Sequence, residues 1–107
     1  MIAARVGQLD VTRVSVDLAG EFDAYDFEPL CEVLDALVSS GEMACVDLSG
    51  VTFLDLKCAR ELAIRSDLCG GCLRLHNPSW EAASSFKACG YGHGSIHWAF
   101  SEVKMLD

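Results

Sequence analysis

The chain has 107 residues, 51% of them hydrophobic, and no apolar run as long as the roughly eighteen residues of a membrane span, so residues 1–107 are expected to form one domain without membrane insertion. The net charge is −8, and residues 1–55 hold eleven acidic against two basic residues, whereas residues 56–107 hold five against six. Because the acidic half repels nucleic acid and the second half lacks a basic cluster with interleaved aromatic residues, no nucleic-acid binding is expected and proteins are the favoured partners.

The opening of the chain predicts an antiparallel hairpin. The first ten residues lack the basic start and long apolar stretch of a signal peptide, so a cytoplasmic location is expected. Residues 2–6 form a weak strand pattern, and residues 7–10 are expected to turn. Residues 11–18 then alternate apolar and polar side chains, which is the period of a half-buried strand. This alternation breaks at residues 19–23.

The clearest helix pattern follows this hairpin. Apolar residues recur at helical spacing from Phe27 to Val38, and residues 39–41 end the pattern. Asp26 is the expected N-cap, because a carboxylate suits the partial positive charge of a helix start.

A strand, a turn and a second helix are predicted in the middle of the chain. Residues 43–48 predict the strand, Ser49 and Gly50 the turn, and residues 56–68 the helix. Asp55 is expected to cap this helix by accepting a hydrogen bond from a free backbone amide. The side chains expected to face inward are Ala59, Leu62, Ala63 and Ser66.

The last part of the chain predicts a strand over residues 72–76 and a third helix that opens at residues 77–79 and runs to Gly90. Residues 90–94 are expected to form a flexible loop, and residues 96–100 a short strand. Strands alternating with helices through short connections favour parallel pairing. The predicted fold class is therefore α/β, with a mixed sheet of four to five strands, an opening antiparallel hairpin and the order β-α-β-α-β-α.

Three sequence motifs follow one another along the chain. They are Gly-Glu-Phe-Asp at residues 20–23, Val-Asp-Leu-Ser-Gly-Val-Thr-Phe-Leu-Asp at residues 46–55, and the segment at residues 70–79 that begins Gly-Gly and enters a helix. Together they resemble the STAS domain, the fold of bacterial anti-sigma factor antagonists, and the resemblance covers most of the chain. It implies a non-enzymatic protein-interaction module that acts in transcription regulation by partner switching.

The resemblance also draws attention to Leu56. In the family, an anti-sigma kinase binds this domain and phosphorylates a serine just after the aspartate, which breaks the complex. Here that position is Leu56, so no hydroxyl is present to receive the roughly two negative charges of a phosphoryl group. The resemblance therefore implies a partner-binding surface that phosphorylation at this position does not switch. Its expected residues are Asp23, Asp55, Leu56, Lys57 and Arg60.

The expected partner is an anti-sigma factor, a kinase-like protein or another STAS protein. An alternative with the same fold is a scaffold or transporter-accessory subunit that binds an ATPase. No cofactor, catalytic residue or metal ligand is expected. Leu56 is expected to be exposed and to contact the partner, and the opposing hypothesis is that it packs against its own helix. Lys57 and Arg60 could bind an anion or belong to a solvated helix face.

Cysteine and acidic residues allow further interpretations. Cys69 and Cys72 form a Cys-x-x-Cys motif, but it follows a helix, whereas redox pairs begin one, and no second ligand pair for zinc accompanies it. Thiol redox chemistry or metal binding through this pair is the alternative function that belongs to a different class from protein interaction. The cysteines interpreted as small hydrophobic residues are Cys31, Cys45, Cys58, Cys72 and Cys89. The acidic residues that could meet a basic partner or a cation, without the spacing of a calcium loop, are Glu21, Asp23, Asp26, Glu28, Glu32 and Asp35.

Overall fold

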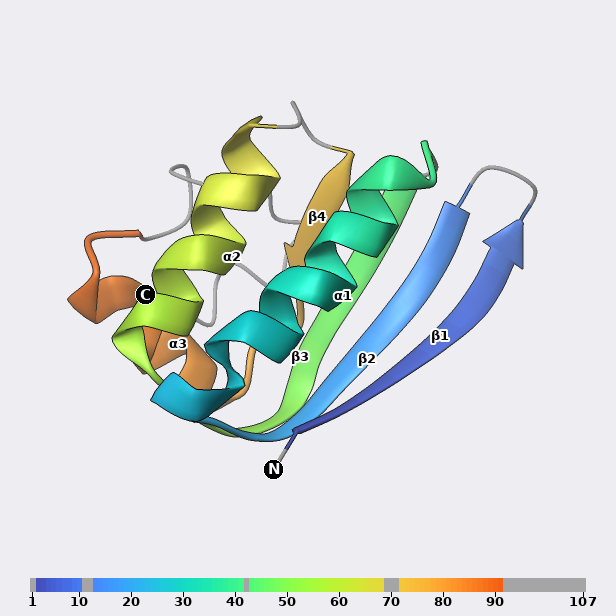
Figure 1. Cartoon of the computed structure of the whole chain (residues 1–107). Helices are drawn as coiled ribbons and strands as arrows, with labels where there is room; N and C mark the ends of the chain where they lie inside the picture. Colours follow the sequence, from blue (N-terminus) through green and yellow to red (C-terminus); the bar gives the residue numbers. More distant parts are fainter. Residues whose placement is uncertain (1, 11–12, 42, 69–71, 92–107) are drawn as a thin grey trace.

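The computed structural model describes residues 2–10, 13–41, 43–68 and 72–91. Figure 1 shows the arrangement of their helices and strands. The elements in chain order are β1 (Ile2–Asp10), β2 (Arg13–Phe22), the 3-10 helix η1 (Ala24–Asp26), α1 (Phe27–Ser39), β3 (Met43–Leu54), α2 (Leu56–Leu68), β4 (Leu73–His76) and α3 (Trp80–Ala88).

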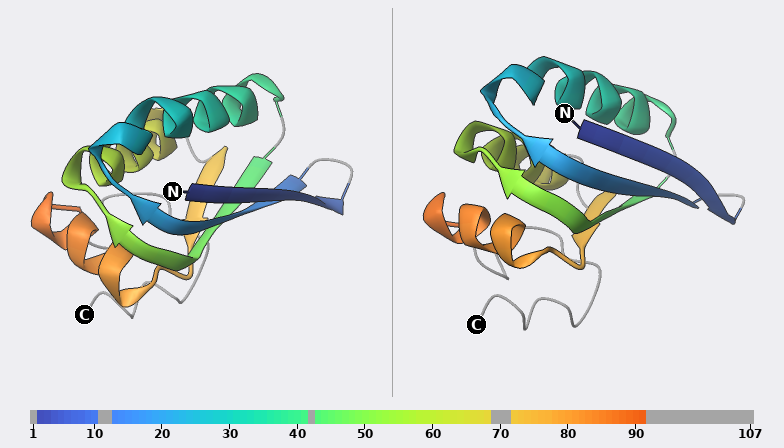
Figure 2. Two further views of the ribbon diagram at one scale, coloured as in Figure 1. Left: turned by 60° about the horizontal axis from the view of Figure 1, so that its bottom comes forward. Right: turned by 90° about the horizontal axis from the view of Figure 1, so that it is seen from below.

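The four strands form one mixed sheet in the order β1-β2-β3-β4. β1 pairs antiparallel with β2, whereas β2, β3 and β4 are parallel. Parallel neighbours need crossover connections, and α1 and α2 provide them. Both helices lie over the same face of the sheet, and α3 lies beside the end of β3 (Figures 1 and 2). The predicted α/β class with an opening hairpin is confirmed, while the predicted strand at residues 96–100 lies outside the described residues.

The hydrophobic core lies between this face of the sheet and the helices. Every second residue is buried from Val14 to Leu18 in β2 and from Ala44 to Leu48 in β3, as expected for strands with one covered face. The helices contribute the apolar stripe that their sequence period predicts. The buried core residues of the sheet's two central strands and of α1 are Val14, Val16, Leu18, Phe22, Ala44, Val46, Leu48, Val51, Leu54, Leu30, Leu34 and Leu37.

Helix α2 matches its prediction in both bounds and orientation. All four side chains predicted to face inward are buried, and Cys58 is buried with them. The buried Ser66 hydroxyl donates a hydrogen bond to the Leu73 carbonyl at 2.7 Å, so its polarity is satisfied. At the start of the helix, the Lys57 amide donates to the Asp55 carboxylate at 2.9 Å, which confirms Asp55 as the cap.

The predicted N-cap of α1 is at the expected position, but its side chain does not cap the helix. Asp26 precedes the helix but makes no side-chain hydrogen bond to it. Its carboxylate instead accepts from the Asp23 amide at 3.0 Å, while the Asp23 carboxylate accepts from the Tyr25 amide at 2.9 Å. This reciprocal capping box starts η1, a turn of helix that the sequence pattern does not reveal.

β1, β2 and β3 are longer than the sequence predicts, whereas β4 begins one residue later than predicted. β1 continues through the predicted turn at residues 7–10, β2 through residues 19–22, and β3 through Ser49 and Gly50 to Leu54. Register shifts interrupt the β2–β3 pairing between Asp17 and Ala19 and again between Gly20 and Glu21. Such bulges break the alternation of side chains without ending the ladder, so the strand ends predicted from alternation alone are wrong.

Asp47 stabilises the irregular part of β3 through hydrogen bonds. Its carboxylate accepts hydrogen bonds from the Ser49 amide at 2.8 Å, the Ser49 hydroxyl at 2.5 Å and the Asn77 side-chain amide at 3.3 Å. Burial by itself would raise the pKa of Asp47, but the hydrogen bonds from Ser49 and Asn77 and the charge of His76 lower it below its ordinary value. The ionised carboxylate therefore stabilises the folded state.

We expect Asp47→Ala to lower the free energy of unfolding by about 1 kcal/mol at pH 7. Because the folded-state pKa is depressed, the contribution is fully present above the unfolded pKa of about 3.9 and is lost as pH falls through the lower folded value. Urea unfolding of both proteins between pH 7 and pH 2.5 should show the difference shrinking below about pH 4. Asp67→Ala, which removes an exposed carboxylate, is the control with little expected effect. A difference that does not change with pH would contradict this role.

Candidate functional site

The residues expected to bind a partner lie at the carboxyl ends of β2 and β3. The Asp55 amide donates a hydrogen bond to the Phe22 carbonyl at 2.7 Å, which holds the two strand ends together. Asp23 follows the end of β2 and Asp55 follows the end of β3, so the parallel pairing brings these distant residues to one edge. Ligand and partner sites of α/β sheets commonly lie at this edge.

The two aspartates of this edge organise the backbone. Each carboxylate accepts a hydrogen bond from an amide two residues later: Asp23 from the Tyr25 amide in η1, and Asp55 from the Lys57 amide in α2. The Cys58 thiol also donates to the Asp23 carbonyl at 3.6 Å and so links α2 to η1. The aspartates therefore orient the start of both helices.

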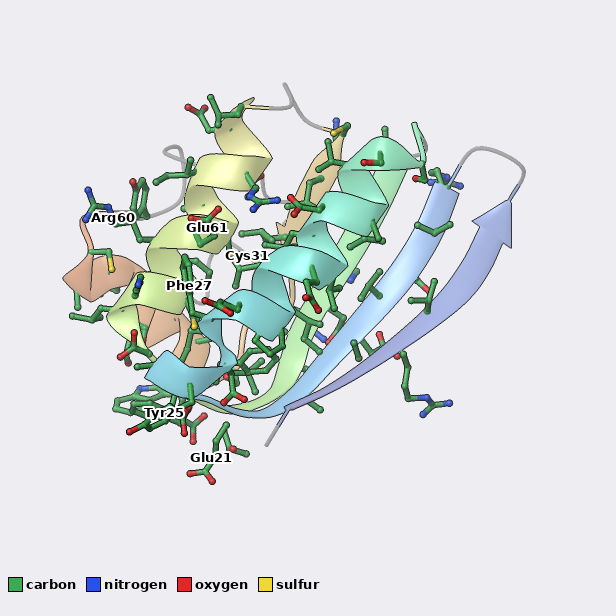
Figure 3. The ribbon with its side chains drawn as sticks, viewed as in Figure 1. Glu21, Tyr25, Phe27, Cys31, Arg60 and Glu61 are labelled. Carbon is green, nitrogen blue, oxygen red and sulfur yellow. The ribbon has the colours of Figure 1, made fainter. Side chains whose placement is uncertain are left out.

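Large apolar side chains are exposed around these strand ends. Leu56, the first residue of α2, is 51% exposed, and this confirms the prediction that it faces solvent. Phe53 on β3 and Tyr25 on η1 are exposed as well, Tyr25 by 92%. Figure 3 shows Tyr25 and Glu21 projecting from the same end of the molecule. Exposed apolar groups gathered at one end of a domain favour contact with another protein.

Lys57 and Arg60 lie on the first turns of α2 but in different surroundings. The Lys57 ammonium lies 4.3 Å from the centre of the Phe27 ring, a cation–π contact between α2 and α1. Arg60 is exposed on the side of α2 opposite α1 (Figure 3). Arg65 on the same helix pairs with Glu61 at 2.6 Å and also with Asp35, whereas Arg60 has no ion pair with any of the residues that the structure describes.

A groove of about 490 Å³ opens beside these residues, between the start of α2 and the end of α3. Its lining residues are Leu56, Lys57, Arg60, Ala88, Cys89 and Tyr91. The Cys89 thiol donates to the Leu56 carbonyl at 3.4 Å, which joins the two walls. Burial raises the pKa of Cys89, against the opposing charge of Arg60, so this thiol stays protonated near neutral pH.

Sequence reasoning found one wall of this groove and missed the other. Leu56, Lys57 and Arg60 come directly after the motif that ends at Asp55, and this position identifies them as candidate site residues. Cys89 and Tyr91 come from the end of a later helix, where Gly90 with a φ of 89° turns the chain and the Tyr91 amide donates to the Phe86 carbonyl at 2.8 Å. The sequence does indicate that a helix ends at Gly90. It does not indicate which part of the protein this helix end packs against.

The described cysteines include free thiols and one disulfide-bonded residue. Cys31, Cys45, Cys58 and Cys89 are free, and Cys58 is fully buried in the core, where burial and then the charges of Asp55 and Asp26 raise its pKa to about 11. Cys72 packs against the core but is disulfide-bonded, which corrects its interpretation as a small hydrophobic residue only. Cys69, the other member of the Cys-x-x-Cys motif, lies outside the described residues.

The described part of the chain contains no group of three or more His, Cys, Asp or Glu side chains that could hold a metal ion. None of its helices is long and apolar enough to cross a membrane.

Comparison with known proteins now identifies the family. A family model described as "Mlab, STAS domain" matches residues 7–96. The chain belongs to the STAS domain family. The resemblance seen in the sequence motifs is thereby confirmed. A search of curated proteins finds no significant match.

Two solved structures share the STAS fold of this chain. The anti-sigma factor antagonist SpoIIAA in its unphosphorylated form matches with a TM-score of 0.64 at 18% identity, over 96% of this chain and 93% of that chain. A serine-to-glutamate variant of RsbS from Moorella thermoacetica matches with a TM-score of 0.66 at 15% identity, over the same shares. At these identities the likeness concerns the fold.

Proposed function

We propose that this STAS domain is a non-enzymatic interaction module that binds a regulatory protein through the surface around Asp23, Asp55, Leu56, Lys57 and Arg60. The partner belongs to the anti-sigma factor, kinase-like or STAS proteins, and the complex acts in transcription regulation in the cytoplasm. Serine phosphorylation at the start of α2 does not switch the binding. The fold shared with an anti-sigma factor antagonist supports this class of function.

The exposure of Leu56 is the observation that carries the proposal. Leu56 is 51% exposed at the first position of α2, so it leaves apolar surface in contact with water at a position where a polar side chain would be better hydrated. Burying such a side chain at an interface is worth roughly 1.5–3 kcal/mol in transfer terms, before the costs of association. No residue with a hydroxyl group occurs between Thr52 and Ser66, so the helix start offers no acceptor for a phosphoryl group. Binding through this surface is therefore constitutive.

Leu56→Glu is expected to weaken partner binding at least tenfold, about 1.4 kcal/mol, with the fold intact. The new carboxylate places a charge where the leucine would be desolvated. The partner is first identified by pull-down from the native cytosol and mass spectrometry, and its affinity for each purified variant is then measured by calorimetry. Circular dichroism and thermal unfolding check the fold.

Leu68→Glu is the matched control for this experiment. Leu68 is 79% exposed at the other end of the same helix, so the substitution adds the same charge to α2 away from the proposed surface. Unchanged affinity in Leu68→Glu together with weakened affinity in Leu56→Glu supports the proposed surface. Equal affinity of the Leu56→Glu and unmodified proteins would exclude it.

A further inference from the structure

We infer that the groove between α2 and α3 accepts an acidic side chain of the partner protein, which pairs with Arg60 while an adjacent apolar residue covers Leu56. This inference rests on the proposed function and names the chemistry of the partner. The groove is the one lined by Leu56, Lys57, Arg60, Ala88, Cys89 and Tyr91.

The charge of the groove selects an acidic occupant. The chain carries eight basic against sixteen acidic residues, yet two basic residues line this groove and no acidic residue does. Asp55, the residue before Leu56, does not line the groove, and its carboxylate accepts a hydrogen bond from the Lys57 amide at 2.9 Å. Charge complementarity at an interface orients the partner and rejects partners of the wrong sign. A basic segment would be repelled here.

Arg60 is the group available for pairing. Its guanidinium presents several N–H donors in a planar fork that suits a carboxylate, and no described residue forms an ion pair with it. Arg65 on the same helix has its donors engaged by Glu61 and Asp35. Lys57 contributes positive charge, but its ammonium is held over Phe27 on the side of α1.

The shape of the groove fits a side chain of a larger partner. A volume of about 490 Å³ is in the range of ligand sites, but the groove is partly open to solvent and has apolar as well as basic lining residues. Leu56 and Arg60 are four residues apart on α2 and so lie on one face of the helix. An acidic residue next to an apolar one on the partner can therefore meet both together.

Titration with short peptides tests this inference without the natural partner. The probe is an end-blocked six-residue peptide of alternating Glu and Leu, and its control alternates Gln and Leu. Nuclear magnetic resonance of the ¹⁵N-labelled protein follows the amide signals of residues 56, 57, 60, 88, 89 and 91. We expect saturable shifts at these positions with the Glu peptide, at least tenfold weaker binding of the Gln peptide, and weaker binding as ionic strength rises.

Variants of the protein complete the test. Arg60→Glu should abolish binding of the Glu peptide, whereas Arg5→Glu, the same substitution at an exposed position of β1, should leave it unchanged. Absence of shifts at the groove, or equal binding of both peptides, would overturn the inference. Self-association of the protein that Arg60→Glu removes would also overturn it, by assigning the groove to a second copy of the chain.

The two proposals fail in different ways. If the Glu peptide does not bind but Leu56→Glu still weakens the natural complex, the acidic occupant is excluded and the proposed function stands. If the peptide binds the groove but Leu56→Glu leaves partner affinity unchanged, the groove is an anion-accepting site outside the partner interface.

Discussion

Phe86→Ala is expected to lower the free energy of unfolding by about 3–5 kcal/mol, the largest loss predicted for this chain. Phe86 is fully buried and belongs to the core cluster that joins α3 to the sheet. Helix α3 has nine residues, too few to be stable alone, so its position depends on this packing. Urea denaturation followed by circular dichroism measures the loss.

Trp80→Ala is the control for the Phe86 experiment. It removes a larger aromatic side chain from the same helix, but Trp80 is 78% exposed, so the expected change is within about 0.5 kcal/mol. Similar losses for both variants would mean that α3 does not pack as described. The Phe86 carbonyl also accepts the Tyr91 amide at 2.8 Å, so α3 fixes one wall of the groove as well as part of the core.

Helix α2 shows what the sequence could predict. Its bounds, its cap Asp55 and its buried side chains Ala59, Leu62 and Ala63 agree with the structure. These features depend on residues close together in the chain, namely an aspartate before an apolar period of 3.6 residues. The three family motifs then placed the exposed Leu56 at the start of this helix.

The features that the sequence could not predict depend on contacts between distant segments. β3 continues past Ser49 because Gly50 pairs with Ala19 of β2 beyond the register shift, despite residues that ordinarily favour a turn. The groove likewise depends on a contact between Cys89 and Leu56, and no sequence period relates these two positions. The local pattern therefore located one side of the site, and the packing of α3 supplied the other.

Gly50→Ala tests the pairing that the local pattern missed, and we expect it to destabilise the protein by about 1–3 kcal/mol. A Cβ atom on Gly50 would lie 2.9 Å from the Cβ of Ala19 and 3.3 Å from the Leu18 carbonyl oxygen. Replacing glycine by alanine at a permissive site stabilises a protein by about 0.4–1 kcal/mol through the unfolded chain. The clash is expected to exceed this gain because a Cβ atom moves only with its backbone. Urea unfolding of both proteins measures whether the free energy of unfolding falls or rises.

A second substitution shows whether the close approach of β2 and β3 causes the loss. Ala19→Gly removes the opposing Cβ, so the double variant should recover part of the stability lost in Gly50→Ala, and the double-mutant cycle gives the coupling between the two positions. Recovery should be incomplete, because the Leu18 carbonyl stays near the new methyl group. Gly7→Ala is the control, since its Cβ would meet only the rotatable Ser15 hydroxyl at 3.1 Å. A neutral or stabilising Gly50→Ala would mean that β2 and β3 lie farther apart here, and would weaken the argument that their paired ends hold Asp23 and Asp55 at one edge.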